Sequence, residues 1–310
     1  MEKNYLYFHD RFGGAEEHLH GVSKIIYEVR TPYQLIQVVE SPTFGKMLII
    51  DGDVQSSLID EYIYHESLVH PALLTAQLPK VVVILGGGEG STLREILKHK
   101  SVTKAIMVDI DKDATDIAKE YMKEWHQGAF DDPRSTLINT DARAFVESNL
   151  SNNSVDVFIS DLTEPYEGGP SYKLYSVEFY KTIFDRLKEN GVFVLQASLL
   201  RVTNYKMHAI IRNTLKQIFP IVRSYFAYVP AFDTTWGFII ASKKNDPKAF
   251  TREEIDYMIK EQIEGDLRFY DGETHIALFN LPKDIRKLID SEKEIITDSN
   301  YIPLERKENL

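Results

Sequence analysis

Four acidic side chains stand where the chain leaves a series of predicted strands. Glu89 lies in a glycine-rich turn, and Asp109, Asp141 and Asp161 follow three later apolar runs. The carboxyl ends of parallel strands meet at one edge of an open α/β sheet, where such sheets bind ligands. We therefore expect the four carboxylates to line one crevice, where they can bind a cation, accept a proton or hydrogen-bond to hydroxyl groups. For Asp141 alone, helix capping is a competing explanation.

The glycine-rich turn and the strand after it indicate a nucleoside ligand. The apolar run 81–85 ends in Gly-Gly-Gly-Glu-Gly at 86–90 and passes into a helical pattern. Asp109 ends a second apolar run, 19 residues after the last of these glycines, near the spacing of a carboxylate that holds ribose hydroxyls. Glu89 would repel a pyrophosphate, so the turn suits a cationic ligand such as a sulfonium nucleoside with an amine tail. A tight turn with no ligand is the alternative.

Composition excludes several classes of protein. The 310 residues include 43% hydrophobic side chains, carry a net charge of −11 and contain no cysteine. Such a chain is globular, repels nucleic acid, attracts polycations and has neither disulfides nor a zinc–thiolate site. No apolar run is long enough to span a membrane, and residues 1–4 lack the features of a signal peptide. We therefore expect a cytoplasmic protein with no nucleic-acid or membrane partner.

The order of predicted elements defines the fold class. Residues 1–76 alternate β-prone runs with turns and end in a helix over 60–76 that Pro71 should kink or divide. From residue 80 strands alternate with helices, which implies a parallel sheet. We predict an α/β fold, with a small antiparallel β domain (1–76) before a Rossmann-like, doubly wound sheet of the methyltransferase type (77–310) that has a C-terminal helical extension.

The individual elements are predicted from their periodicity. The expected strands are 25–30, 33–40, 46–50, 53–59, 81–85, 105–108, 136–140, 155–160 and 192–197, with a final pair at 221–228 and 237–241. The expected helices are 60–76, 91–98, 112–124, 142–149, 203–219 and 251–264, the last opened by a capping box of Thr251 and Glu254. Residues 162–175 lack periodicity, which is typical of a lid at a ligand edge, or of a plain surface loop.

No metal site is expected from the histidines. His65 and His70 resemble a zinc-binding pair on a helix, but they stand five residues apart. Side chains at that spacing do not share a helix face.

Together these motifs resemble the polyamine aminopropyltransferases, the spermidine synthase family, from about residue 36 to residue 243. The resemblance rests on Leu-Ile-Ile-Asp-Gly (48–52) with Gln55, Asp-Glu-Tyr-Ile-Tyr-His-Glu (60–66), Gly-Gly-Gly-Glu-Gly (86–90), Asp-Ile-Asp (109–111), Asp-Asp-Pro-Arg (131–134) and Ser-Asp (160–161). Four further stretches resemble the thermospermine synthase branch: Gly-Glu-Gly-Ser (88–91), Asp-Ala-Arg-Ala (141–144), Gly-Gly-Pro-Ser-Tyr-Lys-Leu-Tyr (168–175) and Asp-Thr-Thr-Trp-Gly (233–237).

The resemblance implies a reaction and its donor site. An acceptor amine attacks the aminopropyl carbon next to the sulfonium of decarboxylated S-adenosylmethionine, and methylthioadenosine leaves. The donor is a co-substrate, and no metal or redox cofactor is implied. By resemblance, the donor is held by Asp109 on the ribose, Asp141 and Ala142 at the adenine, Pro170 in the lid, and Gln55, His65 and Glu89 around the tail or the acceptor.

On the acceptor side, the resemblance makes Asp161 the proton acceptor, helped by Tyr64. Glu164 stands where the family usually has Asp, and Phe232 stands where many members have Tyr. Both positions belong to the acceptor side of the family's site, so these two departures concern acceptor binding. Spermidine converted to thermospermine or a related tetraamine is favoured, and putrescine converted to spermidine is the alternative.

A longer acceptor has more charge and more methylenes to place than putrescine. Glu164 and Glu167 could meet an added ammonium, and Tyr172, Phe232 and Trp236 could cover the methylenes. The competing explanation is that these aromatic residues are ordinary core residues.

Three other functions are alternatives to aminopropyl transfer. A methyltransferase usually has an acidic residue two places before the first glycine, where this chain has Ile84. A nicotinamide-dependent dehydrogenase is disfavoured by the glycine spacing. A catalytically silent, nucleoside-binding assembly protein would be expected to lack Asp161 or Tyr64, and both are present. By resemblance, a homodimer or homotetramer is expected, with polyamines as the small-molecule partners.

Overall fold

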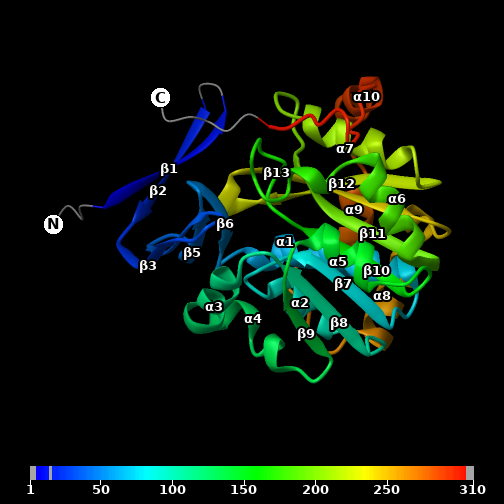
Figure 1. Ribbon diagram of the computed structural model, residues 1–310, viewed down its shortest axis with the longest axis horizontal. Coiled ribbons are helices and arrows are strands. Elements are labelled where there is room, and N and C mark those ends of the chain that lie inside the picture. Colours follow the sequence, from blue (N-terminus) through cyan, green and yellow to red (C-terminus); the bar gives the residue numbers. More distant parts are fainter. Residues whose placement is uncertain (1–4, 14–15, 305–310) are drawn as a thin grey trace.

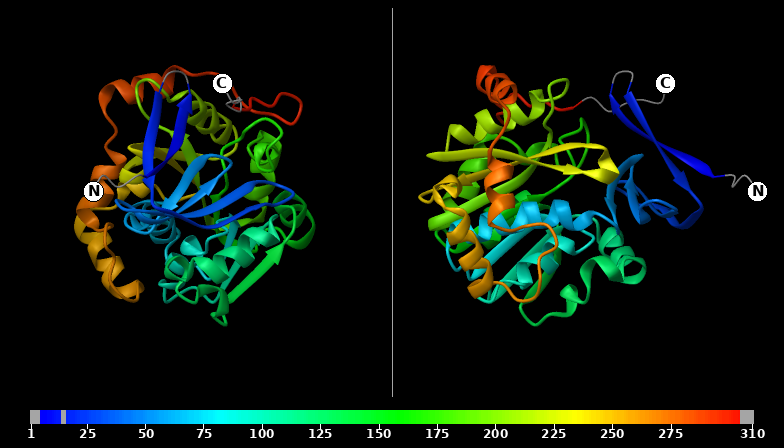
Figure 2. Two further views of the ribbon diagram at one scale, coloured as in Figure 1. Left: turned by 90° about the vertical axis from the view of Figure 1, so that its left-hand side faces the viewer. Right: turned by 180° about the vertical axis from the view of Figure 1, so that it is seen from behind.

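The computed structural model describes residues 5–13 and 16–304. Within these residues the strands form a two-stranded hairpin, a four-stranded sheet and a seven-stranded sheet. The two smaller sheets are N-terminal, and the hairpin extends from one side of the molecule (Figures 1 and 2). The predicted fold class is confirmed: a small antiparallel sheet precedes a Rossmann-like sheet that is covered by helices.

The four-stranded sheet is a chain of antiparallel hairpins, β3 (Lys24–Arg30), β4 (Leu35–Ser41), β5 (Gly45–Ile50) and β6 (Asp53–Ser57). Asp51 and Gly52 join the last two strands, with φ of 50° and 92°. A two-residue hairpin turn of type I′ needs positive φ at both positions, and Asp-Gly is one of the pairs that adopt it readily. The separate hairpin of β1 (Leu6–Gly13) and β2 (Glu16–Val22) was not predicted, because its residues form no continuous apolar or β-branched run.

The large sheet has the strand order β12-β13-β11-β10-β7-β8-β9. The pairs from β11 to β9 are parallel, whereas β13 is antiparallel to both β11 and β12. All the parallel strands therefore place their carboxyl ends at one edge, where the candidate site lies. The strands are β7 (Val81–Gly86), β8 (Lys104–Asp109), β9 (Ser135–Asn139), β10 (Val155–Asp161), β11 (Leu187–Leu199), β12 (Ile221–Val229) and β13 (Thr234–Ser242).

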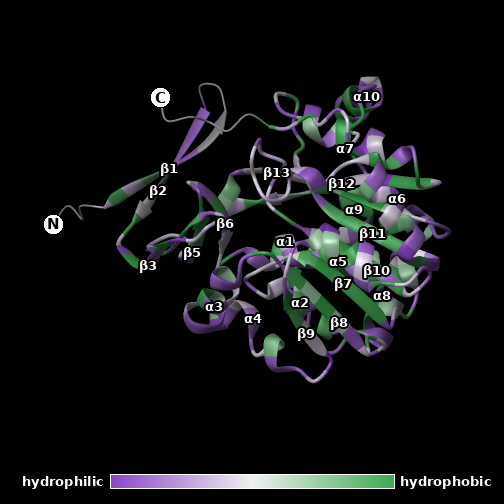
Figure 3. Cartoon of the chain, viewed as in Figure 1, coloured by the Kyte–Doolittle hydropathy of each residue, from purple (hydrophilic) through white to green (hydrophobic). Residues whose placement is uncertain are grey.

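Helices cover both faces of the large sheet. Along β7, Val82 and Ile84 face one apolar cluster and Val83 and Leu85 face the other, which is why the strand reads as an unbroken apolar run (Figure 3). The first cluster contains α1 (Glu61–Ala76), α2 (Ser91–Leu97), α8 (Arg252–Gln262) and α9 (Gly272–Phe279), and the second contains α5 (Ala142–Asn149), α6 (Val177–Arg186) and α7 (Lys206–Lys216). The remaining helices are α3 (Lys112–Tyr121), α4 (Lys123–His126) and α10 (Lys283–Ser291).

One predicted helix is undivided at its proline, and another is split in two. Helix α1 runs through Pro71 without division. The carbonyl of Ser67, which the missing N–H of Pro71 leaves free, accepts a hydrogen bond of 2.8 Å from the hydroxyl of Tyr225. The predicted helix over 112–124 is instead two helices, because Met122 leaves the helical conformation with φ −124° and ψ 40°. The capping box of Thr251 and Glu254 is confirmed.

The domain division at residue 76 stays a prediction. Helix α1, which that division groups with the small sheet, packs in the same apolar cluster as β7. Within the described residues, no helix is both long and apolar enough to cross a membrane. Residues 1–4, on which the expected location partly depends, and residues 305–310 of the predicted C-terminal extension lie outside the described residues.

Candidate active site

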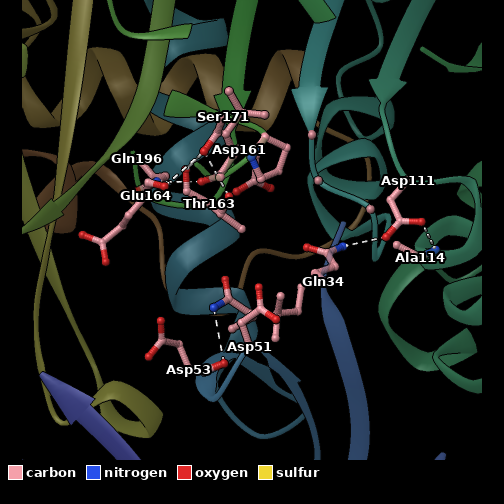
Figure 4. Close-up of a pocket in the computed structure, with 18 of the residues that line it drawn as sticks. Gln34, Asp51, Asp53, Asp111, Ala114, Asp161, Thr163, Glu164, Ser171 and Gln196 are labelled. Carbon is pink, nitrogen blue, oxygen red and sulfur yellow. Dashed lines mark hydrogen bonds between the residues drawn. The ribbon is translucent and has the colours of Figure 1, made fainter. Parts of the chain in front are cut away.

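A cavity of about 820 Å³ lies between the small sheet and the carboxyl edge of the large sheet. Glu89, Asp109, Asp141 and Asp161 all line it, so the predicted convergence is observed. Figure 4 shows Asp161 on one side of this cavity and Asp111 on the other. Among the described lining residues, Arg30 is the only basic side chain, against nine acidic ones. These nine are Asp10, Asp51, Asp53, Glu89, Asp109, Asp111, Asp141, Asp161 and Glu164. Such a wall attracts a ligand with several positive charges.

The glycine turn seats Asp161 at the edge of the sheet. Gly86 has a φ of 82°, and a Cβ placed on it would lie 2.3 Å from the carbonyl oxygen of Asp161. The N–H of Gly87 donates to that carbonyl at 2.9 Å. A Cβ on Gly87 would lie 3.2 Å from Oδ2 of Asp161. Glycine is therefore needed here so that β7 and β10 can end side by side.

Two hydroxyl groups hold the carboxylate of Asp161. Tyr64 in α1 donates to Oδ1 at 2.7 Å, and Thr92 in α2 donates to Oδ2 at 2.6 Å. Burial and the negative charge of Glu89 raise the pKa of Asp161, while the charge of His65 and the two hydroxyl bonds oppose that rise. Burial and the charge of Asp161 raise the pKa of Tyr64 well above its usual value, so Tyr64 remains a neutral donor.

His65 lies behind Glu89 and is not among the residues that line the cavity. Its Nε2 lies 2.9 Å from Oε1 of Glu89, and its Nδ1 lies 2.8 Å from Oε2 of Glu61. Burial lowers the pKa of His65, but the hydrogen bonds to Glu61 and Glu89 outweigh burial and raise it to about 10. The ring is therefore an imidazolium, held in place through Glu61, which also pairs with Arg94 at 2.9 Å.

The partners of His65 argue against a metal ion at this position. His65, Glu89 and Asp161 each offer a ligand atom, and these atoms lie within 4.8 Å of one another. A metal ligand must be the neutral imidazole, with a free lone pair. Both ring nitrogens of His65 are instead taken up by carboxylate oxygens, at 2.8 Å from Glu61 and 2.9 Å from Glu89. The donor set does not fit a resident metal.

Asp109 and Asp111 form the part of the wall nearest α3. Oδ1 of Asp109 accepts from the backbone N–H of Asp111 at 2.8 Å. Burial, followed by the charges of nearby carboxylates, raises the pKa of Asp109 to about 6 despite that hydrogen bond. Asp111 caps α3 and accepts from Thr31 at 2.7 Å and from Gln34 at 3.0 Å, so it ties the small sheet to the wall.

Asp141 occupies both of the positions considered from sequence, at the start of a helix and in the cavity wall. It caps α5 by accepting from the N–H of Ala144 at 2.7 Å, and it lines the cavity. Ala142, the first residue of α5, and Pro170, in the loop after β10, also line the cavity.

A C-terminal strap, residues 296–304, lies on the loop that carries Pro170. The N–H of Leu304 donates to the carbonyl of Pro165 at 2.8 Å, and the N–H of Glu167 donates to the carbonyl of Leu304 at 3.1 Å. Pro303 and Leu304 line the cavity themselves. Sequence reasoning missed this contribution, since no motif marks the strap.

Gln55, Glu164, Phe232 and Trp236 all line the cavity, as predicted for substrate contacts. The rings of Phe232 and Trp236 meet edge to face, with centroids 5.1 Å apart. Glu167 is exposed and does not line the cavity, so its predicted contact with an acceptor charge is wrong.

Tyr172 also lies outside the lining, and its ring contacts that of Tyr301 with centroids 4.7 Å apart. Asp53 and Tyr166 are lining residues that sequence reasoning missed. The hydroxyl of Tyr166 lies 3.2 Å from Oδ2 of Asp53 and 3.0 Å from Oε2 of Glu164.

The fold and the acidic site define a Rossmann-like protein with a carboxylate-lined cavity at the carboxyl edge of its sheet. The chain matches the family model of the spermine/spermidine synthase domain over residues 61–253 and that of the spermidine synthase tetramerisation domain over residues 15–57. It therefore belongs to the spermidine synthase family, is an aminopropyltransferase, and has the N-terminal region through which the family assembles into oligomers.

Relatives and solved structures agree with this assignment. The chain is 47% identical to the polyamine aminopropyltransferase of Sulfurisphaera tokodaii, over 93% of this chain and 94% of that one. It is 45% identical to the polyamine aminopropyltransferase of Aeropyrum pernix, over 91% of this chain and 90% of that one. A spermidine synthase crystallised with the transition state analogue AdoDATO superposes with a TM-score of 0.86 at 31% identity, over 94% and 97% of the two chains. Spermidine synthase from Thermotoga maritima superposes with a TM-score of 0.84 at 31% identity, over 94% of this chain and 96% of that one.

Proposed function

We propose that this protein moves the aminopropyl group of decarboxylated S-adenosylmethionine onto spermidine, giving thermospermine or a related tetraamine. The observation that carries the proposal is the cavity wall of nine carboxylates, Asp161 among them. The donor brings a sulfonium and an amine into this space in either reaction. A triamine acceptor then adds more positive charge than a diamine acceptor does. Transfer to putrescine, giving spermidine, is the second candidate.

The proposed donor site occupies the side of the cavity nearest β8 and α5. Asp109 accepts hydrogen bonds from the ribose hydroxyls, and Asp141 with Ala142 binds the adenine. Pro170 covers the nucleoside from the loop after β10. Glu89 and Gln55 meet the charged tail, and His65 acts from behind Glu89, which it holds in place.

Asp161 is the proposed proton acceptor. A polyamine amine is mostly an ammonium at neutral pH and has no lone pair to attack with. Asp161 takes one proton from the ammonium, while the hydroxyl of Tyr64 donates to Oδ1 of its carboxylate. The amine nitrogen then attacks the carbon next to sulfur. The new N–C bond forms as the C–S bond breaks, and the bonding pair stays on sulfur. Methylthioadenosine leaves as a neutral thioether, so the protein's work is positioning and desolvation.

Glu164, Phe232 and Trp236 are the proposed acceptor contacts. Glu164 and the nearby Asp53 supply charge for a second ammonium of the acceptor, and the two aromatic rings cover its methylenes. These groups support a longer acceptor, because a diamine needs fewer of them.

Product identification tests the proposal. The protein is incubated with decarboxylated donor and, separately, with putrescine, spermidine and other amines, and the products are separated by chromatography against standards. A tetraamine formed mainly from spermidine is the expected result. Spermidine formed mainly from putrescine would replace the first candidate with the second. We also propose a homodimer or homotetramer, which sedimentation would distinguish.

A further inference from the structure

The hydroxyl group of Thr92 makes an interaction that the proposed reaction does not yet account for. Thr92 is the second residue of α2, and its exposed fraction is 0%. Its Oγ1 lies 2.6 Å from Oδ2 of Asp161. A buried hydroxyl needs a partner, and this one has a carboxylate that faces the cavity rather than a carbonyl of its own helix.

We propose that Thr92 is a positioning residue for the aminopropyl transfer, which fixes the carboxylate of Asp161 for its role as proton acceptor. The inference rests on the proposed function, in which Asp161 takes the proton of the acceptor amine.

The geometry explains what the hydroxyl does. An ionised carboxylate has about four lone-pair sites, two on each oxygen. Tyr64 occupies one site on Oδ1, and Thr92 occupies one on Oδ2. The two donors come from different helices, so together they fix both the position and the plane of the carboxylate. One site on each oxygen is left for the N–H groups of the acceptor.

Thr92 also favours the ionised form of this carboxylate. Burial and Glu89 oppose ionisation of Asp161, and His65, Thr92 and Tyr64 favour it. The other charged or titratable groups that interact with Asp161 are Asp109 and Tyr175. A base must be ionised to act, so losing the hydroxyl should shift the acidic limb of the pH–rate profile to higher pH.

The test compares Thr92→Val, which keeps the shape and removes the hydroxyl, with Thr92→Ser, which keeps the hydroxyl. Thr92→Val is expected to lower kcat by roughly tenfold or more, because a hydrogen bond to a charged group is lost. Its KM for the donor should stay near that of the wild type, and its acidic limb should move to higher pH. Thr92→Ser should restore most of kcat and the original limb.

Thr75→Val is the matched control. Thr75 is also fully buried, and its hydroxyl donates at 2.6 Å, but to the carbonyl of Pro71 in the middle of α1. This variant is expected to lose stability without a shift of the limb. Thermal unfolding of every variant reports whether each one folds.

Asp161→Asn separates failure of the inference from failure of the proposed function. If Asp161→Asn is strongly impaired but Thr92→Val has the wild-type kcat and limb, the positioning role is overturned and the proton acceptor stands. Equal loss in Thr92→Val and Thr92→Ser would also overturn it, because packing would then explain the effect. If Asp161→Asn turns over normally, the proposed proton acceptor is wrong and the role of Thr92 is lost with it.

Discussion

The hydroxyl of Tyr64 lies 2.7 Å from Oδ1 of Asp161, although the two residues stand 97 positions apart in the chain. Helix α1 brings Tyr64 to the edge of the large sheet, and β10 ends there in Asp161. A neutral phenol that donates to a buried carboxylate stabilises its charge without supplying a competing cation. The pair is therefore suited to a base that must approach an ammonium.

Replacing Asp161 tests the base directly. Asp161→Asn removes the proposed proton acceptor but keeps the shape, so turnover should fall roughly a hundredfold or more. Tyr64→Phe should cost less, roughly tenfold, because the carboxylate remains. Calorimetry with methylthioadenosine provides the control, since nucleoside binding should survive both changes. Near-normal turnover of Asp161→Asn would remove Asp161 from this role.

Asp109 gives a prediction about binding and its pH dependence. Asp109→Ala should weaken methylthioadenosine binding by roughly 1–3 kcal/mol, because hydrogen bonds from the ribose to a charged group are lost. The pKa of Asp109 is raised to about 6 in the free protein, and the ribose hydroxyls need the ionised form. Wild-type affinity should therefore fall as the pH drops through about 6. Titration calorimetry at several pH values should show this fall in the wild type and its absence in Asp109→Ala.

His65 gives a prediction about stability. Its pKa is raised from 6.5 to about 10 in the folded protein. A basic side chain whose pKa is higher in the folded than in the unfolded protein stabilises the folded protein. This stabilisation is complete below the pKa of the unfolded state and is lost as the pH rises through the pKa of the folded state. The free energy of unfolding should therefore decline between pH 6.5 and about 10.

The variant His65→Gln isolates this contribution, because glutamine does not titrate. Urea unfolding at several pH values should give a flatter profile for His65→Gln than for the wild type over that range. Other groups titrate at alkaline pH in both proteins, so the difference between the two profiles is the measurement. Parallel profiles would mean that His65 is not held as an imidazolium.

Sequence reasoning located most of the candidate site because the site depends on strand ends. The apolar run of β7 fixes where the sheet ends, the glycines fix the turn, and the parallel order then brings Asp109 and Asp161 to one edge. None of this required knowledge of side-chain contacts.

What sequence reasoning missed depends on tertiary contacts with no local pattern. Thr92 reads as an ordinary residue of a helical stretch, and only the pairing of β7 with β10, which sets Asp161 beside the turn that opens α2, brings its hydroxyl to Asp161. The resemblance puts His65 at the substrates, but both of its ring nitrogens are taken up by Glu61 and Glu89. Leu304 lines the cavity because the strap pairs with a loop about 140 residues earlier, and nothing in a charged C-terminal stretch predicts such pairing.

Acceptor choice is the last prediction, and Trp236 is its probe. The Nε1–H of Trp236 donates to Oε1 of Gln196 at 3.2 Å, and its ring meets Phe232 edge to face. The indole is thus held rigidly in the cavity wall, where it can cover the methylenes of a triamine or stack on its distal ammonium. We expect kcat/KM for spermidine to exceed kcat/KM for putrescine at saturating donor.

Trp236→Ala should lower the ratio of kcat/KM for spermidine to kcat/KM for putrescine by roughly threefold to tenfold, because a diamine in this arrangement does not extend to the indole. Tyr228→Ala, an exposed aromatic residue on neighbouring β12 that does not line the cavity, is the matched control and should leave the ratio unchanged. A wild-type ratio well below one would favour spermidine synthesis. An unchanged ratio in Trp236→Ala would leave the triamine preference standing but assign it to Glu164 and Asp53 instead.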